Sequence, residues 1–181
     1  TTREHRVIDS SRSASKVGLA LAGGGPEGSI YEIGAIRALD EALDGGLQVV
    51  VFSQYVKMID LLSQRLDRNG TPHLVLTGET RDRGRIIRRF NSEQHERVLL
   101  ASLLAGGVGI DLTGASVVLH YDRWWNPAKE NQATDRVHRM GQRRFVQVFK
   151  LVTRDTIEER IDALIRGKTR SLVTKLFGDT Q

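Results

Sequence analysis

Short, almost continuous apolar runs recur along the chain after residue 46, beginning with LQVVVF. Runs of this length without polar alternation are typical of strands that are buried on both faces. Between them, residues 55–69 and 81–91 carry apolar side chains at the three- and four-residue spacing of a helix that buries one face. The alternation predicts an α/β fold with a parallel sheet covered by helices on both faces. The predicted strands are residues 47–52, 73–76, 97–102, 116–121 and 146–152.

Both ends of the chain lie outside this alternation. Residues 155–177 have the spacing of a long amphipathic helix opened by Asp155, a residue type that favours the position before a helix. We expect this helix to pack back onto the sheet. Residues 1–16 are rich in Ser and Arg without a sustained period, which predicts a flexible lead-in. The chain therefore divides into this lead-in, a strand, glycine loop and helix over residues 17–46, and an α/β domain over residues 47–181.

Composition narrows the function classes. The chain has 27 Lys and Arg against 22 Asp and Glu, which gives a net charge of +5. This charge favours an anionic partner such as nucleic acid or nucleotide phosphate. A modest excess of basic residues is also common on solvated surfaces. The absence of cysteine excludes disulfides, thiolate metal sites and cysteine nucleophiles. No apolar run approaches the roughly 18 to 20 residues of a membrane helix. We therefore expect a cytoplasmic or nuclear protein without a membrane partner.

The motif QATDRVHRMGQ, residues 132–142, is a candidate anion site. Gln132, Arg136 and Arg139 are spaced i, i+4 and i+7, so on one helix they would share a face. Two guanidinium groups on one rigid face would form a clamp for a phosphate. A solvated stripe, in which Asp135 and Arg139 form an i, i+4 ion pair, is the alternative.

Three predicted strands end in segments that become polar or glycine-rich. These are VFSQ at residues 51–54, ASLLAGGVGIDL at residues 101–112 and YDRWWNP at residues 121–127. In parallel α/β sheets, ligands bind at the carboxyl ends of the strands. We therefore expect these three segments to lie along one edge of the sheet.

These segments, with QATDRVHRMGQ, LTGETRDRGRIIRRFN and TIEERI, resemble the C-terminal RecA-like lobe of the Swi/Snf-type ATPases, the DNA translocases among the superfamily-two helicases. The resemblance covers residues 47–175, in order. It implies that Arg136 and Arg139 are the catalytic arginine fingers that reach the ATP phosphates, a role that can be worth roughly 10³ to 10⁵ in turnover. The implied nucleotide-binding residues are Gly107, Gly109, Asp111, Gln132, Arg136 and Arg139. The implied DNA-binding residues are Ser53, Gln54, Thr77, Ser102, Gly106 and Trp125.

Two of these positions need comment. Trp125 stands in the WNP signature of that family and is implied to press into the minor groove, whereas a tryptophan that only covers the core is the alternative. Asp111 stands where the family commonly has Asn, which leaves its polar contact open.

The resemblance also implies what the chain lacks. The family's phosphate-binding loop and its Mg²⁺-binding acidic motif lie on the first lobe, and neither occurs here. GKT at residues 167–169 has Asp162 where that loop requires its first glycine. The implied cofactor is ATP with Mg²⁺, bound mainly by the absent first lobe, and the implied partners are double-stranded DNA and the N-terminal RecA-like lobe of the same protein. We expect this chain alone not to turn over ATP.

Residues 16–43, KVGLALAGGGPEGSIYEIGAIRALDEAL, resemble the oxyanion-loop segment of patatin-like lipid acyl hydrolases. No G-x-S-x-G nucleophile elbow follows, so the expected serine is missing. Three alternatives stay open. The segment is the first helix of the lobe with a glycine linker, the chain is a lipid acyl hydrolase fragment without its nucleophile, or the chain is a non-catalytic DNA-binding module.

Overall fold

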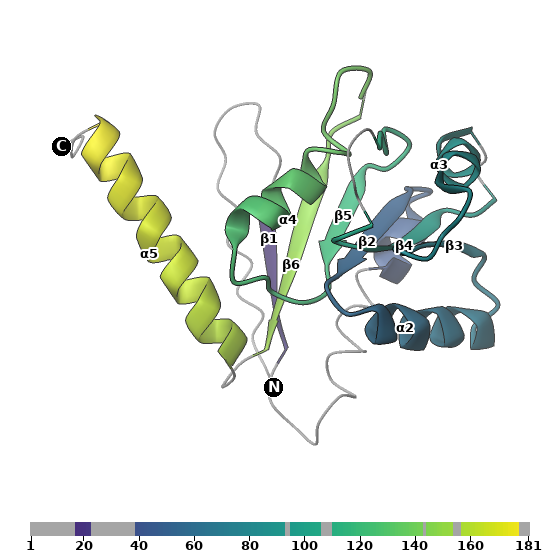
Figure 1. Ribbon diagram of the computed structural model, residues 1–181, viewed down its shortest axis with the longest axis horizontal. Helices are drawn as coiled ribbons and strands as arrows, with labels where there is room; N and C mark the ends of the chain where they lie inside the picture. The colour runs from purple at the N-terminus through teal and green to yellow at the C-terminus, as the bar shows by residue number, and fades with distance from the viewer. Residues whose placement is uncertain are drawn as a thin grey trace.

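A single six-stranded sheet organises the part of the chain that the computed structural model describes, which comprises residues 17–22, 39–92, 95–105, 110–142, 144–153 and 157–177. All strand pairings are parallel, and the strand order is β1-β6-β5-β2-β4-β3 (Figure 1). The strands are β1 (Val17–Ala22), β2 (Val49–Ser53), β3 (His73–Leu76), β4 (Val98–Ser102), β5 (Val117–His120) and β6 (Gln147–Thr153). The predicted parallel sheet is confirmed. Each of the five strands predicted between residues 47 and 152 begins and ends within two residues of its predicted bounds.

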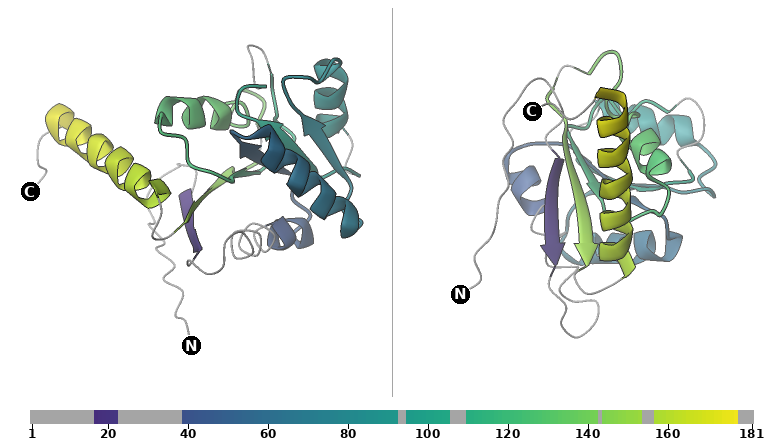
Figure 2. Two further views of the ribbon diagram at one scale, coloured as in Figure 1. Left: turned by 60° about the horizontal axis from the view of Figure 1, so that its bottom comes forward. Right: turned by 90° about the vertical axis from the view of Figure 1, so that its left-hand side faces the viewer.

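Helices flank the sheet on both faces, as predicted (Figure 2). Alternate residues of a strand point to opposite faces. On β2, Val50 and Phe52 therefore join a core cluster with Phe90 of α3, whereas Val49 and Val51 join a second cluster beneath α2. The helices are α2 (Val56–Arg68), α3 (Arg83–Ser92), α4 (Pro127–Thr134) and α5 (Ile157–Phe177).

The last helix only partly meets its prediction. The first turns of α5 lie beside β6, and Asp162 is buried there. The rest of α5 projects away from the sheet (Figure 1). The prediction that this helix packs back onto the sheet therefore holds for its beginning.

The N-terminal segment contributes to the same sheet. β1 pairs with β6 from Val17 opposite Val148 to Ala22 opposite Thr153. Residues 39–44 are helical, and Leu39 and Ala42 pack into the cluster beneath α2. This packing supports the interpretation of the segment's end as a helix of the lobe. Its glycine loop and the flexible lead-in lie outside the described residues, and the division at residue 46 stays a prediction.

Candidate functional site

The three polar strand ends do lie along one edge of the sheet, as predicted. β2 lies between β4 and β5, with Ser53 opposite Ser102 and Phe52 opposite His120. The backbone continues this contact, because the Leu103 N–H donates to the Ser53 carbonyl at 3.0 Å. The loops after β2, β4 and β5 therefore start side by side.

Asp122 joins the loops that follow β2 and β5. Its carboxylate accepts hydrogen bonds from the Ser53 hydroxyl and, at 3.0 Å, from the Gln54 N–H. The Gln54 side chain in turn donates to the carbonyl of Arg123 at 3.3 Å. Burial raises the pKa of Asp122 above its ordinary value, although the two hydrogen bonds oppose that shift. The end of β2 is thus fastened to the end of β5.

Three members of the predicted DNA-binding set are buried at these strand ends. Ser53 and Ser102 are buried, and their hydroxyls bond Asp122 and the Ala105 N–H inside the chain. Thr77 is also buried. Hydroxyl groups at strand ends are drawn to unpaired backbone and carboxylate groups, and those of Ser53 and Ser102 help to hold the loops together. The DNA contacts of Ser53, Ser102 and Thr77 stay predictions. The predicted contact for Gly106 lies outside the described residues.

Trp125 is displayed on the surface. Its side chain is 72% exposed, which excludes the alternative that it covers the core. The loop that carries it is held by hydrogen bonds on both sides. The Asn126 side chain caps α4 by accepting from the Ala128 N–H at 3.0 Å, with Pro127 in the first turn. On the other side, the Trp124 N–H donates to Glu130 at 2.9 Å.

The two predicted finger arginines do not share a helix face, and that prediction is wrong. α4 ends at Thr134, and the chain continues in turns in which Val137 enters the core. The carbonyl of Arg136 leaves the helical pattern to accept from the Leu112 N–H at 2.8 Å. Arg136 is consequently buried, whereas the Arg139 side chain is 46% exposed.

Arg139 is paired with Asp111 on the loop that follows β4. This pair replaces the alternative in which Arg139 pairs with Asp135, and it answers what Asp111 contacts. Burial and the nearby charge of Arg139 lower the pKa of Arg136, and the Asp111 carboxylate opposes that shift. Gly107 and Gly109 lie outside the described residues, and Gln132 is exposed on α4.

Gln142 closes the motif against the core. Its side-chain amide donates to the carbonyls of Ala115 at 2.7 Å, Thr113 at 3.2 Å and Val137 at 3.3 Å. It is preceded by Gly141, whose φ of 101° lies in a region that favours glycine. The end of the motif is therefore fixed by one amide to the segment that leads into β5.

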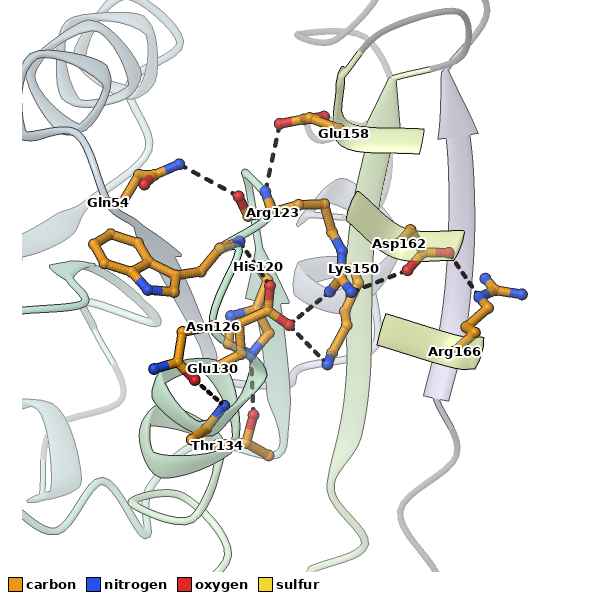
Figure 3. A network of polar contacts seen from close by, with 12 residues as sticks. Gln54, His120, Arg123, Asn126, Glu130, Thr134, Lys150, Glu158, Asp162 and Arg166 are labelled. Carbon is orange, nitrogen blue, oxygen red and sulfur yellow. Dashed lines mark hydrogen bonds and ion pairs between the residues drawn. The ribbon is translucent and has the colours of Figure 1, made fainter. Parts of the chain in front are cut away.

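A buried charge network behind the Trp125 loop was not foreseen from the sequence (Figure 3). Arg123 donates to Glu130 of α4 at 2.6 Å and forms an ion pair with Asp162 of α5 at 2.9 Å. Lys150 of β6 also bonds Glu130, at 2.9 Å. The available signal was Lys150, a charged residue among the apolar residues at the centre of β6, together with Glu130 on the inward side of α4.

His120 lies beside this network. It is fully buried, and its Nε2 lies 2.9 Å from the Thr134 hydroxyl. Burial, followed by the charges of Lys150 and Arg123, lowers the pKa of His120 to about 3. The imidazole is therefore neutral at ordinary pH.

The described residues set limits on other chemistry. No group of His, Asp and Glu side chains among them is arranged to hold a metal ion. Nor is any helix within the described ranges both long enough and apolar enough to cross a membrane.

Comparison with known proteins gives consistent matches. The model of the helicase conserved C-terminal domain matches residues 34–141. An uncharacterized ATP-dependent helicase of Mycoplasma genitalium is 46% identical over 143 residues, which are 78% of this chain and 14% of that protein. Helicase SWR1 of Cryptococcus neoformans is 37% identical over 173 residues, which cover 91% of this chain and 13% of that protein. The chain thus spans only a small part of the curated relatives it matches.

A solved structure with bound nucleic acid is also similar. It is the Sulfolobus solfataricus SWI2/SNF2 ATPase core in complex with dsDNA, with a TM-score of 0.67 and 37% identity, covering 84% of this chain and 32% of that one. The resemblance of residues 16–43 to patatin-like hydrolases receives no support from these comparisons, and the match to the domain model begins at residue 34.

Proposed function

The chain belongs to the helicase conserved C-terminal domain family, as the C-terminal RecA-like lobe of a Swi/Snf-type ATPase, and on this premise we propose that it is the second motor lobe of an ATP-dependent translocase on double-stranded DNA. The observation that carries the proposal is the position of Trp125. Trp125 is 72% exposed and lies on a loop held by hydrogen bonds on both sides, where the carboxyl ends of β2, β4 and β5 meet. Large exposed aromatic side chains on rigid loops are suited to groove or base contacts.

The DNA contacts follow from that edge. Trp125 supplies the groove contact, and Gln54, half-buried at the end of β2, lies on the neighbouring loop. The net charge of +5 favours the phosphate backbone, so binding is expected to be insensitive to sequence and steeply dependent on salt. We therefore propose a cytoplasmic location, or a nuclear one in a cell that has a nucleus.

The nucleotide contacts come from the arginine motif. ATP supplies the phosphoryl group whose transfer to water drives the motor, and its negative charge matches the N–H donors of Arg136 and Arg139. Arg139 is half-exposed, so it can exchange Asp111 for a phosphate, whereas the buried Arg136 holds a fixed position. We assign Mg²⁺ mainly to the first lobe, which carries the family's acidic metal-binding motif. In a protein that combines this lobe with a first lobe, Arg139→Ala should lower turnover about 10³-fold.

The proposal is tested by measuring the affinity of the chain for a short labelled DNA duplex by fluorescence anisotropy across a salt series. Trp125→Ala should weaken binding about tenfold, equivalent to ~1.4 kcal/mol. Phe145→Ala is the matched control. Phe145 is an exposed aromatic residue that precedes β6, so it lies at the amino-terminal ends of the parallel strands, opposite to the ends that carry Trp125. Equal losses for the two variants, or no binding at low salt, would refute the DNA-binding edge.

A further inference from the structure

The loop that displays Trp125 is not held by the packing of Trp125 itself. With 72% of its side chain exposed, the ring gains little from contacts with the protein. Its orientation must therefore come from the backbone on either side. Asn126 fixes the following side by capping α4, and the preceding side consists of Arg123 and Trp124.

Arg123 connects that backbone to two different helices (Figure 3). One terminal nitrogen of its guanidinium donates to Glu130 of α4 at 2.6 Å, and the other pairs with Asp162 of α5 at 2.9 Å. Glu130 uses its second oxygen to accept from the Trp124 N–H at 2.9 Å. The residue directly before Trp125 is therefore fixed by the same carboxylate that holds Arg123.

The network is costly to maintain, which argues for a role beyond packing. The Arg123 side chain is only 2% exposed, and its Nε has no hydrogen-bond partner among the described residues. A buried guanidinium is tolerated only when its charge is compensated, and apolar residues of similar volume often serve stability equally well. Each carboxylate also has a second cation, Lys150 for Glu130 and Arg166 for Asp162. Arg123 is the group that links the two sets.

We propose that Arg123 is a positioning residue that sets the orientation of Trp125, and that α5 controls this orientation through Asp162. The significance for DNA rests on the proposed function, whereas the positioning itself does not. α5 projects away from the sheet, and it contacts Arg123 twice, at the guanidinium through Asp162 and at the backbone N–H through Glu158 at 3.4 Å. A displacement of this helix would therefore be transmitted to the Trp125 loop through Arg123. The helix thereby becomes a point from which the DNA-binding edge can be regulated.

The test uses Trp125 as its own reporter. The chain contains two tryptophans, so Trp124→Phe leaves Trp125 as the only one. In this background, Asp162→Asn preserves the shape of the side chain and removes the charge that holds the second arm of Arg123. The amplitude of the nanosecond motion of the indole, measured by time-resolved fluorescence anisotropy, should increase about twofold.

DNA affinity provides a second readout with a diagnostic sign. Asp162→Asn changes the net charge from +5 to +6, and added positive charge alone should tighten binding to a polyanion. Loosening of Trp125 predicts the opposite, a loss of affinity of about threefold to tenfold, because the side chain must be ordered on binding. Asp60→Asn is the matched control, since it makes the same charge change at an exposed position of α2. That variant should leave affinity unchanged or slightly tighter.

The outcomes separate the two proposals. Increased Trp125 motion in Asp162→Asn, with no further loss of affinity when it is combined with Trp125→Ala, establishes the positioning role. Unchanged Trp125 motion overturns it, whatever the DNA affinity. If Trp125→Ala alone leaves DNA binding intact, the proposed function fails, and the fluorescence result still decides the role of Arg123. If far-UV circular dichroism shows that Asp162→Asn is unfolded, Arg123→Lys replaces it. This variant keeps the charge beside Glu130 but has no second arm, so it should increase the motion of Trp125 in the same way.

Discussion

Asp111 and Arg139 form an ion pair that connects the loop after β4 to the arginine motif. Both side chains are about half-exposed, so the pair lies at the surface and can exchange partners. The Asp111 carboxylate occupies the Arg139 guanidinium, which the proposed function assigns to a phosphate. Under the proposed function, Asp111 and nucleotide would compete for Arg139, whereas Arg136 is held by burial and by the bond between its carbonyl and the Leu112 N–H.

Asp111→Asn should release Arg139 at little cost to stability. An exposed ion pair contributes roughly 0 to 1 kcal/mol, so the melting temperature should fall by at most about 2 to 4 °C. Affinity for inorganic pyrophosphate, measured by titration calorimetry, should rise because the guanidinium loses its competitor. Asp135→Asn is the control, since it removes the acidic residue that sequence spacing would have paired with Arg139. An equal gain in that variant would contradict a specific role for Asp111.

The strands could be predicted from the sequence because their burial is continuous. All five residues of β2 and of β4 are buried, and each run is uniformly apolar up to its terminal serine. β3 was predicted at its observed bounds, His73–Leu76. Short-range patterns suffice here because both faces of a parallel sheet meet helices.

The end of α4 could not be predicted in the same way. The spacing of Gln132, Arg136 and Arg139 suits a helix, but Val137 is drawn into the core and the Arg136 carbonyl bonds Leu112, far away in the sequence. Such tertiary contacts outweigh local helix preference, which amounts to a few tenths of a kcal/mol per residue. The network of Arg123, Glu130 and Asp162 was missed for the same reason, because its members come from three separate segments.

Glu130→Gln should be strongly destabilising. The substitution leaves Arg123 buried and Lys150 mostly buried without the carboxylate that compensates both charges. Removing one partner of a buried pair costs about 3 to 5 kcal/mol, which corresponds to a fall in melting temperature of roughly 10 °C for a chain of this size. Thermal unfolding followed by circular dichroism measures it. Glu79→Gln, at an exposed turn, should melt with the wild type. A loss below about 1 kcal/mol would show that the network is not compensating buried charge.

Gly141→Ala should destabilise the motif through the backbone alone. Gly141 has a φ of 101°, and an added Cβ would meet no atom within 4 Å, so any cost is conformational. That cost is about 1 to 2 kcal/mol for a residue held in a left-handed region. Gly78→Ala is a matched control, because the same space is open there and no positive φ is involved. Chemical denaturation should therefore separate the two variants, and equal midpoints would refute the conformational explanation.

The buried His120 predicts a loss of stability on acidification. Its pKa is lowered to about 3 in the folded protein, against 6.5 for an ordinary histidine. As pH falls below 6.5, the unfolded chain binds a proton that the folded chain refuses, so the free energy of unfolding drops by at most about 1.4 kcal/mol per pH unit until the folded pKa is reached. Asp122 acts in the opposite direction, because its pKa is raised and its protonation favours the folded state.

Urea unfolding at about pH 7 and about pH 5 isolates the contribution of His120. Over this interval the wild type should lose roughly 1 to 2 kcal/mol more than His120→Gln, which has no group to titrate at that position. Thr134→Val removes the hydroxyl that lies 2.9 Å from His120 but leaves the imidazole, so it should be less stable at both pH values and keep the wild-type pH dependence. If His120→Gln and the wild type lose the same free energy on acidification, the imidazole is protonated in the folded protein and its burial does not control the acid response.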